Sequence, residues 1–423
     1  MNKKILNLAI PSIVSNITVP LLGLVDTAIV GHMGTSEYIG AIAVGSMIFN
    51  VTYWLFGFLR MGTGGLTAQA YGRNDKHEAS TTGLRSLLIS LLLGSAIIVL
   101  QVPLYSTALW IITPDSGIID LIWTYIKICV WGAPASLGLF ALNGWFIGMQ
   151  NTRIPMLISI TQNIVNIIVS LLFVYGFGMK LNGVAAGTLT AQWSGFLIGL
   201  VFFIKRCPYL SVTGIGEISA LKRFFTVNRD IFLRTIFLVT VNLYFVAAGA
   251  KGGTLILAVN TLLMQLFTLY SFVMDGFAYA AEALCGRYYG ARDDASLHAT
   301  IHGVFLWSIA LTTLYTLTYY IFGEQILCIL TDEPAVIKTS MDYLPWAWAI
   351  PAAGIIAFVW DGVFIGMTMT RGMLAGTCSA AIVFFTVYFS LYPTLSNHAL
   401  WLAFILYLLT RGITQTIWWK RVK

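Results

Sequence analysis

The stretch P-S-I-V-S-N-I-T-V-P-L-L-G-L-V-D-T-A-I-V-G-H-M-G, Pro11 to Gly34, decides the fold. It is as long as the ~20 apolar residues that cross a bilayer core of ~30 Å as a helix. Pro20 lies near its middle, and Asp26 follows six residues later. An ionisable side chain at that depth is costly and marks a candidate functional residue. We predict a membrane-spanning helix with a functional Asp26; an acid solvated at the interface or held by a neighbouring helix is the structural alternative.

The composition is that of a polytopic membrane protein. The chain has 423 residues, of which 58% are hydrophobic and only 10% are charged, and its mean hydropathy is +0.83. Soluble domains carry about 25% charged residues. The net charge of +7 follows from basic cytoplasmic loops, so no nucleic-acid partner is expected. The opening Met1-Asn2-Lys3-Lys4 is interpreted as the inner end of the first span rather than as a signal peptide.

Apolar runs broken by charged and turn residues predict twelve spans. The spans are expected at residues 8–31, 38–70, 82–110, 118–148, 155–176, 183–204, 231–250, 255–288, 297–322, 338–367, 373–393 and 399–418. With the N-terminus inside, only Lys180, Lys251 and Lys338 fall outside, whereas the loops on the other side are rich in Lys and Arg. This bias predicts a multi-pass protein of the cell (inner) membrane with both termini in the cytoplasm.

An internal repeat divides the chain. Phe146-Ile147-Gly148-Met149 recurs 218 residues later as Phe364-Ile365-Gly366-Met367. Each half holds six predicted spans, so both halves enter the membrane from the same side and the repeat is parallel, as in many transporters. The longest basic break separates the halves. We therefore predict an N-terminal lobe at 1–204, a cytoplasmic linker at 205–230 and a C-terminal lobe at 231–423.

The first group of candidate site residues lies in the N-terminal half. Asn163, Asn166 and Ser170 share one face of the fifth span, and Thr188 lies in the first turns of the sixth. All are expected at about the membrane depth of Asp26. A carboxylate among amides and hydroxyls can hold a proton or a hard cation. The alternative is that these polar residues only join helices by hydrogen bonds.

The second group lies in the C-terminal half. Asp275 and Glu282 lie two helical turns apart on the eighth span, and Asp361 lies late in the tenth. These acids are predicted in the inner half of the membrane. Three interpretations stay open: a second ion site, a structural ion pair with Arg60 or Arg234, or contacts of an inner gate.

Several kinds of chemistry are not indicated. The five His residues fit no metal-ligand spacing, and the chain lacks a G-x-x-x-x-G-K-[ST] phosphate loop. No Ser-His-Asp arrangement stands out. We therefore expect neither an enzyme nor an organic cofactor. A membrane-embedded enzyme or a scaffold is the rival class, and the parallel repeat disfavours it.

Several motifs together resemble a known family. They are Pro20-Leu21-Leu22-Gly23-Leu24-Val25-Asp26 in the first span, Phe56-Gly57-Phe58-Leu59-Arg60-Met61-Gly62-Thr63 in the second, Asp275-Gly276-Phe277-Ala278 in the eighth and Asp361-Gly362-Val363-Phe364-Ile365-Gly366 in the tenth. In these motifs the chain is similar, over nearly its whole length, to multidrug and toxic compound extrusion (MATE) transporters of the DinF-like branch.

The resemblance implies a fold and an activity. It implies two six-helix lobes forming a V, and export of amphipathic, often cationic compounds in exchange for H⁺ or Na⁺ by alternating access. Asp26 would be the ion-responsive acid, with Asn163, Asn166 and Thr188 around it. Asp361 would match the acid that relatives of the NorM branch use in a C-lobe cation site, so a Na⁺ site at Asp361 stays open.

One position departs from the family pattern. Many relatives carry an Asp where this chain has Ser170, so Asp26 would act alone. A lone acid favours H⁺ over Na⁺ as the coupling ion. The expected partners are small-molecule substrates and the lipid bilayer, and we expect a monomer. A flippase for lipid-linked oligosaccharides of the same superfamily is the alternative function.

Overall fold

The computed structural model describes residues 1–31, 36–207, 209 and 214–422. The side chains of residues 19–24, 27, 36 and 422 lie outside this description. The predicted role of Pro20 and the end of the first motif at 32–34 therefore fall outside the described part.

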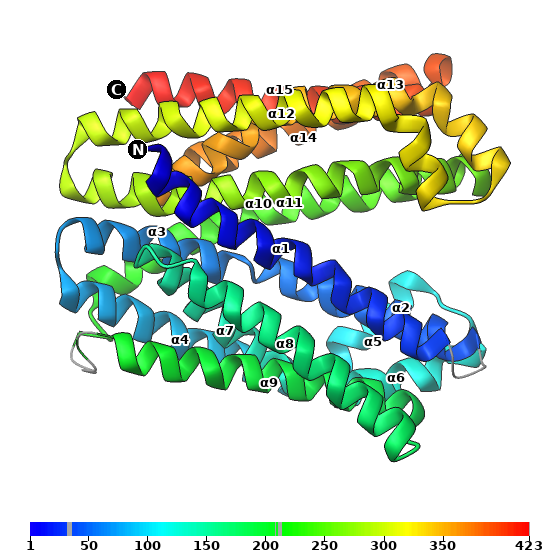
Figure 1. The fold of residues 1–423 in the computed structure, drawn as a ribbon, viewed down its shortest axis with the longest axis horizontal. Coiled ribbons are helices and arrows are strands. Elements are labelled where there is room, and N and C mark those ends of the chain that lie inside the picture. Colours follow the sequence, from blue (N-terminus) through cyan, green and yellow to red (C-terminus); the bar gives the residue numbers. More distant parts are fainter. Residues whose placement is uncertain (32–35, 208, 210–213, 423) are drawn as a thin grey trace. The chain divides into compact units, whose positions relative to one another are not determined.

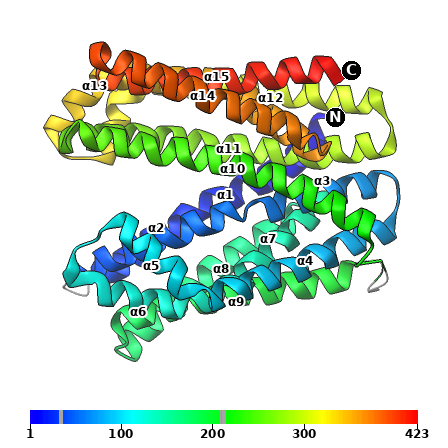
Figure 2. The same ribbon diagram turned by 180° about the vertical axis from the view of Figure 1, so that it is seen from behind.

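All regular structure in the described residues is helical (Figures 1 and 2). In chain order the elements are α1 Asn2–Gly31, α2 Ser36–Leu55, α3 Phe58–Gly72, α4 Lys76–Val99, α5 Gln101–Ile112, η1 Ser116–Ile118, α6 Ile119–Cys129, η2 Val130–Gly132, α7 Ala133–Gly148, α8 Arg153–Leu171, η3 Leu172–Gly176, α9 Lys180–Arg206, α10 Ile218–Lys251, α11 Thr254–Ala291, α12 Asp294–Leu330, α13 Pro334–Gly366, α14 Thr370–Leu395 and α15 Asn397–Val422.

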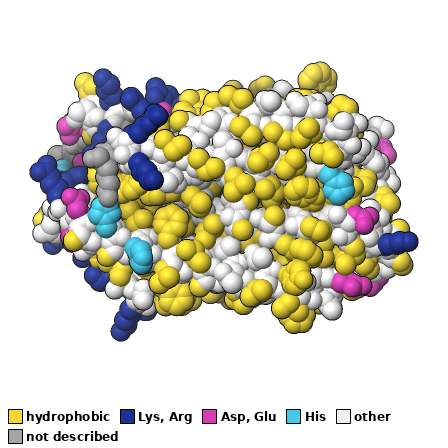
Figure 3. All heavy atoms as spheres, turned by 90° about the horizontal axis from the view of Figure 1, so that it is seen from above, with side chains coloured by type: hydrophobic (Ala, Val, Ile, Leu, Met, Phe, Trp, Pro, Cys, Tyr) yellow, Lys and Arg dark blue, Asp and Glu magenta, His cyan; other side chains and the backbone are white. Residues whose placement is uncertain are grey.

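The predicted membrane fold is confirmed. Within the described residues, 11 helical stretches are long and apolar enough to cross a membrane. The remaining predicted span, 8–31, coincides with α1. On the face drawn in Figure 3, Lys and Arg gather at one end and the surface between the two ends is largely hydrophobic. This distribution suits a chain whose middle lies in lipid and whose basic end meets an aqueous phase.

Two predicted boundaries are wrong. The third span was expected at 82–110, but α4 ends at Val99 and a separate α5 begins at Gln101. Pro103 lies in the first turn of α5, where its missing N–H costs no helical hydrogen bond. The seventh span was expected to begin at 231, but α10 begins at Ile218. The first turns of α10 contain Lys and Arg. Hydropathy excludes these residues from a predicted span, although both are good helix formers.

The chain forms two compact units. Unit 1 comprises Met1–Ile13 and Arg229–Lys423, and unit 2 comprises Val14–Asn228. The helices α1 and α10 thus contribute their first segments to one unit and their remainders to the other. This division differs from the predicted lobes at 1–204 and 231–423 mainly by that exchange. The lobe boundaries themselves stay a prediction.

The repeat is visible in the backbone of the turns. Residues with a left-handed φ occur in pairs 218 residues apart: Asn74 with Arg292, Gln150 with Thr368, and Gly178 with Ser396. The helix caps repeat as well. Asp75 accepts a hydrogen bond from the Glu78 N–H at 2.9 Å, and Asp293 accepts one from the Ser296 N–H at 3.0 Å. The two halves therefore share one scaffold in one register.

Close helix contacts at glycines repeat as well. Gly144 and Gly148 of α7 face α3, and a Cβ at these positions would lie 2.2 Å from the Arg60 carbonyl oxygen and 2.6 Å from Thr67. In unit 1, Gly362 and Gly366 of α13 face α11. There a Cβ would lie 2.3 Å from the Ala278 carbonyl oxygen and 2.4 Å from that of Glu282. Such small residues four apart let helix backbones pack closely, the main source of helix association in lipid.

We predict that Gly366→Ala lowers the thermal midpoint of the protein in mild detergent. The added methyl group has only backbone to displace, so the cost is about 1–3 kcal/mol. Gly148→Ala is expected to behave similarly. Gly31→Ala is the control because nothing lies within 4 Å of a Cβ there. Equal midpoints for Gly366→Ala and Gly31→Ala would contradict the close packing of α13 on α11.

Candidate functional site

Unit 2 brings three of the predicted polar residues together from three helices. Asp26 lies near the end of α1, Asn166 on α8 and Thr188 on α9. The Asn166 amide donates to Thr188 Oγ1 at 3.2 Å, and the Thr188 hydroxyl lies 3.5 Å from Asp26 Oδ2. Asp26 is 7% exposed and Asn166 is fully buried. The carboxylate therefore lies at the end of a short chain of polar side chains inside the helix bundle.

Several polar atoms of this group have no hydrogen-bond partner among the described residues. They are Asp26 Oδ1 and Asn166 Oδ1; Ser170 Oγ, on the same face of α8, is a third such atom. Buried polar atoms are nearly always satisfied in folded proteins. Because two unsatisfied oxygens occur within this group, it can accept an added proton or a hydrogen-bonding ligand.

Asn163 and Ser170 take separate places on the same face of α8. The Asn163 amide donates to the Thr18 carbonyl oxygen of α1 at 2.9 Å, and the Thr18 and Ser159 hydroxyls lie 2.8 Å apart. Asn163 thus joins α8 to α1 rather than contacting Asp26. Ser170 packs against Gly187 of α9, where a Cβ would lie 2.1 Å from Ser170 Oγ.

Thr18 and Ser159 were missed by the sequence reasoning. Ser159 lies four residues before Asn163 and could have been found by extending the same helix face. Thr18 gave no comparable signal in the sequence. In the structure its hydroxyl also donates to the Ser15 carbonyl oxygen of its own helix.

The repeat shows what else this fold can place at the same position. In the 218-residue register, Asp26, Asn166 and Ser170 correspond to Tyr244, Phe384 and Tyr388. The Tyr244 ring centroid lies 6.3 Å from that of Phe384 and 5.4 Å from that of Tyr388. Unit 1 therefore fills with aromatic rings the place that unit 2 fills with a carboxylate and its polar neighbours.

Asp361 lies in a different environment. Arg234 of α10 and Arg411 of α15 both donate to Asp361 Oδ2, the latter at 2.6 Å. Gln415 donates to Oδ1 at 2.7 Å. All four side chains are buried. Of the three predicted interpretations of the C-terminal acids, the pairing of Asp361 with Arg234 is the one observed. Arg411 and Gln415 were missed as partners, although their i, i+4 spacing places them on one helix face.

Asp275 and Glu282 are not among these partners of Asp361. Glu282 is fully buried on α11 and Asp275 is partly exposed. Both residues have interactions of their own. The structure therefore does not gather the three C-terminal acids into one cluster.

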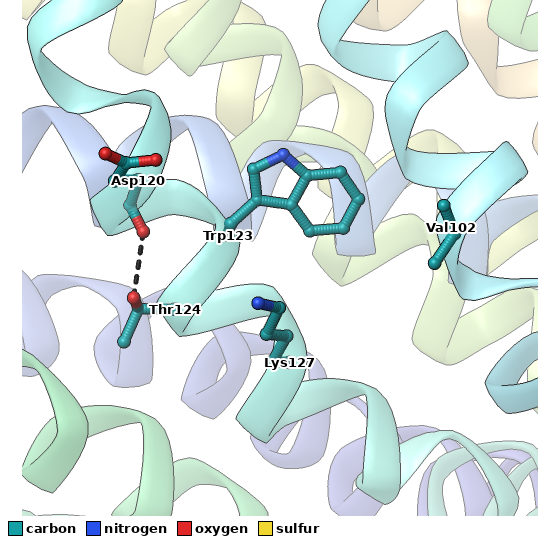
Figure 4. A pocket seen from close by; sticks show the side chains of 5 residues that line it. All are labelled: Val102, Asp120, Trp123, Thr124 and Lys127. Carbon is teal, nitrogen blue, oxygen red and sulfur yellow. Dashed lines mark hydrogen bonds between the residues drawn. The ribbon is translucent and has the colours of Figure 1, made fainter.

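An open hollow of about 420 Å³ lies between α5 and α6. Figure 4 shows Trp123 of α6 pointing toward Val102 of α5, with Asp120 and Lys127 on either side of it. The Thr124 hydroxyl donates to the Asp120 carbonyl oxygen at 2.8 Å. This lining holds one acid and one base, so it favours neither sign of charge.

We predict that Asp361→Asn is strongly destabilising. It would leave two buried guanidinium groups without a carboxylate, and breaking such a cluster costs about 3–5 kcal/mol. Arg411→Gln should cost less, because the pair of Arg234 and Asp361 stays intact. Thermal unfolding in mild detergent measures both. The control, Asp120→Asn in the open hollow, should change stability by less than about 0.5 kcal/mol. A greater loss in Arg411→Gln than in Asp361→Asn would contradict this assignment.

The comparisons with known proteins agree with this architecture. The MatE family model matches residues 11–172 and again 231–390, once in each half of the repeat. The DNA damage-inducible protein F of Escherichia coli K12 is 36% identical over 99% of this chain and 92% of its own length. The multidrug resistance protein MdtK of Proteus mirabilis is 24% identical over 99% of this chain and 95% of its own.

Solved structures share the fold. One described as MATE in the bent conformation has a TM-score of 0.90 at 20% identity, covering 99% of this chain and 94% of that one. A transporter of the MOP superfamily from Pyrococcus furiosus has a TM-score of 0.88 at 20% identity, covering 99% and 95%. Members of this family are membrane transporters rather than enzymes. By both the repeated match and the full-length relative, the chain belongs to the MATE family of multidrug efflux transporters.

Proposed function

We propose that this protein is a secondary active exporter that expels amphipathic or cationic compounds in exchange for protons bound at Asp26. It acts by alternating access, as a monomer in the inner membrane with both termini in the cytoplasm. The observation that carries the proposal is the buried carboxylate of Asp26, which has no cationic partner among the described residues and one oxygen without a hydrogen bond. An acid in this position can bind a proton or a cationic group, but not both.

The aromatic counterpart of this group supports a functional role. If the position only needed to be filled, rings like those of Tyr244, Phe384 and Tyr388 would fill it at lower cost. Burying a carboxylate costs free energy, and packing contacts do not compensate for this cost. The polar group of unit 2 is therefore better explained by what it binds than by how it packs.

The mechanism is competition for one acid. While Asp26 is ionised, it holds a cationic or hydrogen-bonding substrate, with Asn166 and Thr188 supplying further polar contacts. When the site opens outward, a proton neutralises Asp26 and the substrate leaves. A bend of α1 at Pro20 would then displace the substrate. The required coupling is modest, ~1–3 kcal/mol between proton and substrate.

The contacts of Asp361 favour protons over Na⁺ as the coupling ion. A bound Na⁺ needs several oxygen ligands, but both carboxylate oxygens of Asp361 already accept hydrogen bonds from cationic or amide groups. Two guanidinium groups beside it also repel a cation. No group of three or more His, Cys, Asp or Glu suited to a metal occurs among the described residues. Asp361 is better explained as a structural anion between α10, α13 and α15.

We predict that Asp26→Asn abolishes export driven by a pH gradient. Proteoliposomes loaded with a fluorescent cationic drug are given either a pH gradient or a Na⁺ gradient. Wild type should respond to the pH gradient, and the variant should lose about tenfold or more of the driven rate, the range of a coupling of this size. Asp120→Asn is the matched control, an acid of the same unit that lies in the open hollow.

Two results would contradict the proposal. Coupling to the pH gradient that persists in Asp26→Asn would remove Asp26 from the mechanism. Export driven by Na⁺ that survives in the variant would move coupling to the acids of unit 1.

A further inference from the structure

A small hollow in unit 1 is lined by three helices and one turn. Its volume is about 230 Å³, and it lies where α11 ends, α12 begins and α13 turns into α14, beside the last turns of α15. This is the end of the unit at which α12 is capped by Asp293. The lining residues are Tyr289, Asp294, Leu297, His298, Met367, Met369 and Trp419.

The lining combines one carboxylate with soft, polarisable surfaces. Asp294 makes no hydrogen bond through its side chain and no ion pair among the described residues. Trp419 and Tyr289 add aromatic rings, and the His298 ring meets Trp419 edge-on at 6.1 Å. Met367 and Met369 supply thioethers. The lining includes no Lys or Arg. A carboxylate beside aromatic faces is the combination that binds organic ammonium groups by charge and cation–π attraction.

The corresponding place in unit 2 lacks both the acid and the indole ring. In the 218-residue register, Tyr289 and Met367 correspond to Tyr71 and Met149, so the frame is the same. Asp294, however, corresponds to Lys76, and Trp419 to Val201. The acid and the indole therefore belong to unit 1 alone.

The counterpart in unit 2 is also contacted by described residues that follow α9. The Tyr209 backbone N–H donates to Ser80 Oγ at 3.3 Å, and Ser80 is the counterpart of His298. Arg85 of the same helix binds the Gly214 and Ile215 carbonyl oxygens at 2.9 and 3.0 Å. Tyr209, Gly214 and Ile215 thus contact α4, whereas Tyr289, Asp294 and His298 of the hollow beside α12 are exposed.

We propose that this hollow is a binding site for an organic cation with an ammonium head and an aromatic or apolar body, separate from Asp26. The volume is below the ~300 Å³ of cavities that enclose drug-sized ligands, so the head enters and the body stays outside. As a capture site for transported cations, it rests on the proposed function. The ammonium head of phosphatidylethanolamine has the same chemistry, and the experiment separates the two sources.

The test is photolabelling of the full-length protein in nanodiscs made of phosphatidylglycerol. The probe is 4-azidobenzyl-trimethylammonium, and labelled peptides are mapped by mass spectrometry. Labelling is expected on the α12 and α15 segments around His298 and Trp419. Asp294→Asn should reduce it about tenfold and Trp419→Phe less, in line with the loss of a charge and the retention of a ring. Lys76→Asn, at the matched position of unit 2, should leave it unchanged.

The outcomes test the site itself and distinguish the two sources of the ammonium group. Equal labelling of wild type and Asp294→Asn, or equal labelling by an uncharged probe of the same shape, overturns the site. In nanodiscs with phosphatidylethanolamine, loss of wild-type labelling assigns the site to the lipid head, and retained labelling assigns it to dissolved cations. Labelling needs no ion gradient, so it can succeed when Asp26→Asn transport assays fail, and the two proposals are tested separately.

Discussion

A carboxylate inside a bilayer must be balanced by a neighbouring cation or by a proton, because lipid offers it no solvation. Asp361 has the first solution, and we propose the second for Asp26. Asp361 is fixed between Arg234 and Arg411 and ties three helices of unit 1 together. Asp26 has a hydroxyl at 3.5 Å as its hydrogen-bond partner. The contacts of Asp361 hold the helices rigidly, so the groups that balance its charge do not exchange. In the proposed function, Asp26 keeps the capacity to exchange the proton or cation that balances its charge, as a transporter requires.

The duplication separates what the scaffold needs from what the function needs. The paired glycines of α7 and α13, the left-handed turns and the Asp caps of α4 and α12 occur in both halves, because they shape the backbone. The chemistry placed on that backbone has diverged. Asp26 corresponds to Tyr244 in the 218-residue register, and Asp361 corresponds to Asn143. Comparing matched positions of the two halves thus separates residues that shape the backbone from residues that differ in chemistry.

The fold could be predicted from the sequence because its determinants are local. Length and hydropathy locate helices in a membrane, and the repeat divides them into two similar halves. Errors arose where hydropathy does not decide helix ends, as at Ile218, where α10 begins among basic residues. The site was predicted in part. The face of α8 gave Asn166, but the partners of Asp361 came from helices distant in sequence. No spacing rule connects Arg234 with Arg411, because only packing brings α10 and α15 to the same carboxylate.

The course of α1 gives the proposed mechanism a mechanical basis. This helix is continuous from Asn2 to Gly31, yet Met1–Ile13 belongs to unit 1 and the rest, including Asp26, belongs to unit 2. The helix α10 is also divided: its residues before Arg229 belong to unit 2, and those from Arg229 onward belong to unit 1. A proton at Asp26 that alters the path of α1 therefore acts on an element that both units share. In the proposed mechanism substrate and proton need only exclude each other at one acid, and the shared helix α1 is the element that would pass this exchange on to both units.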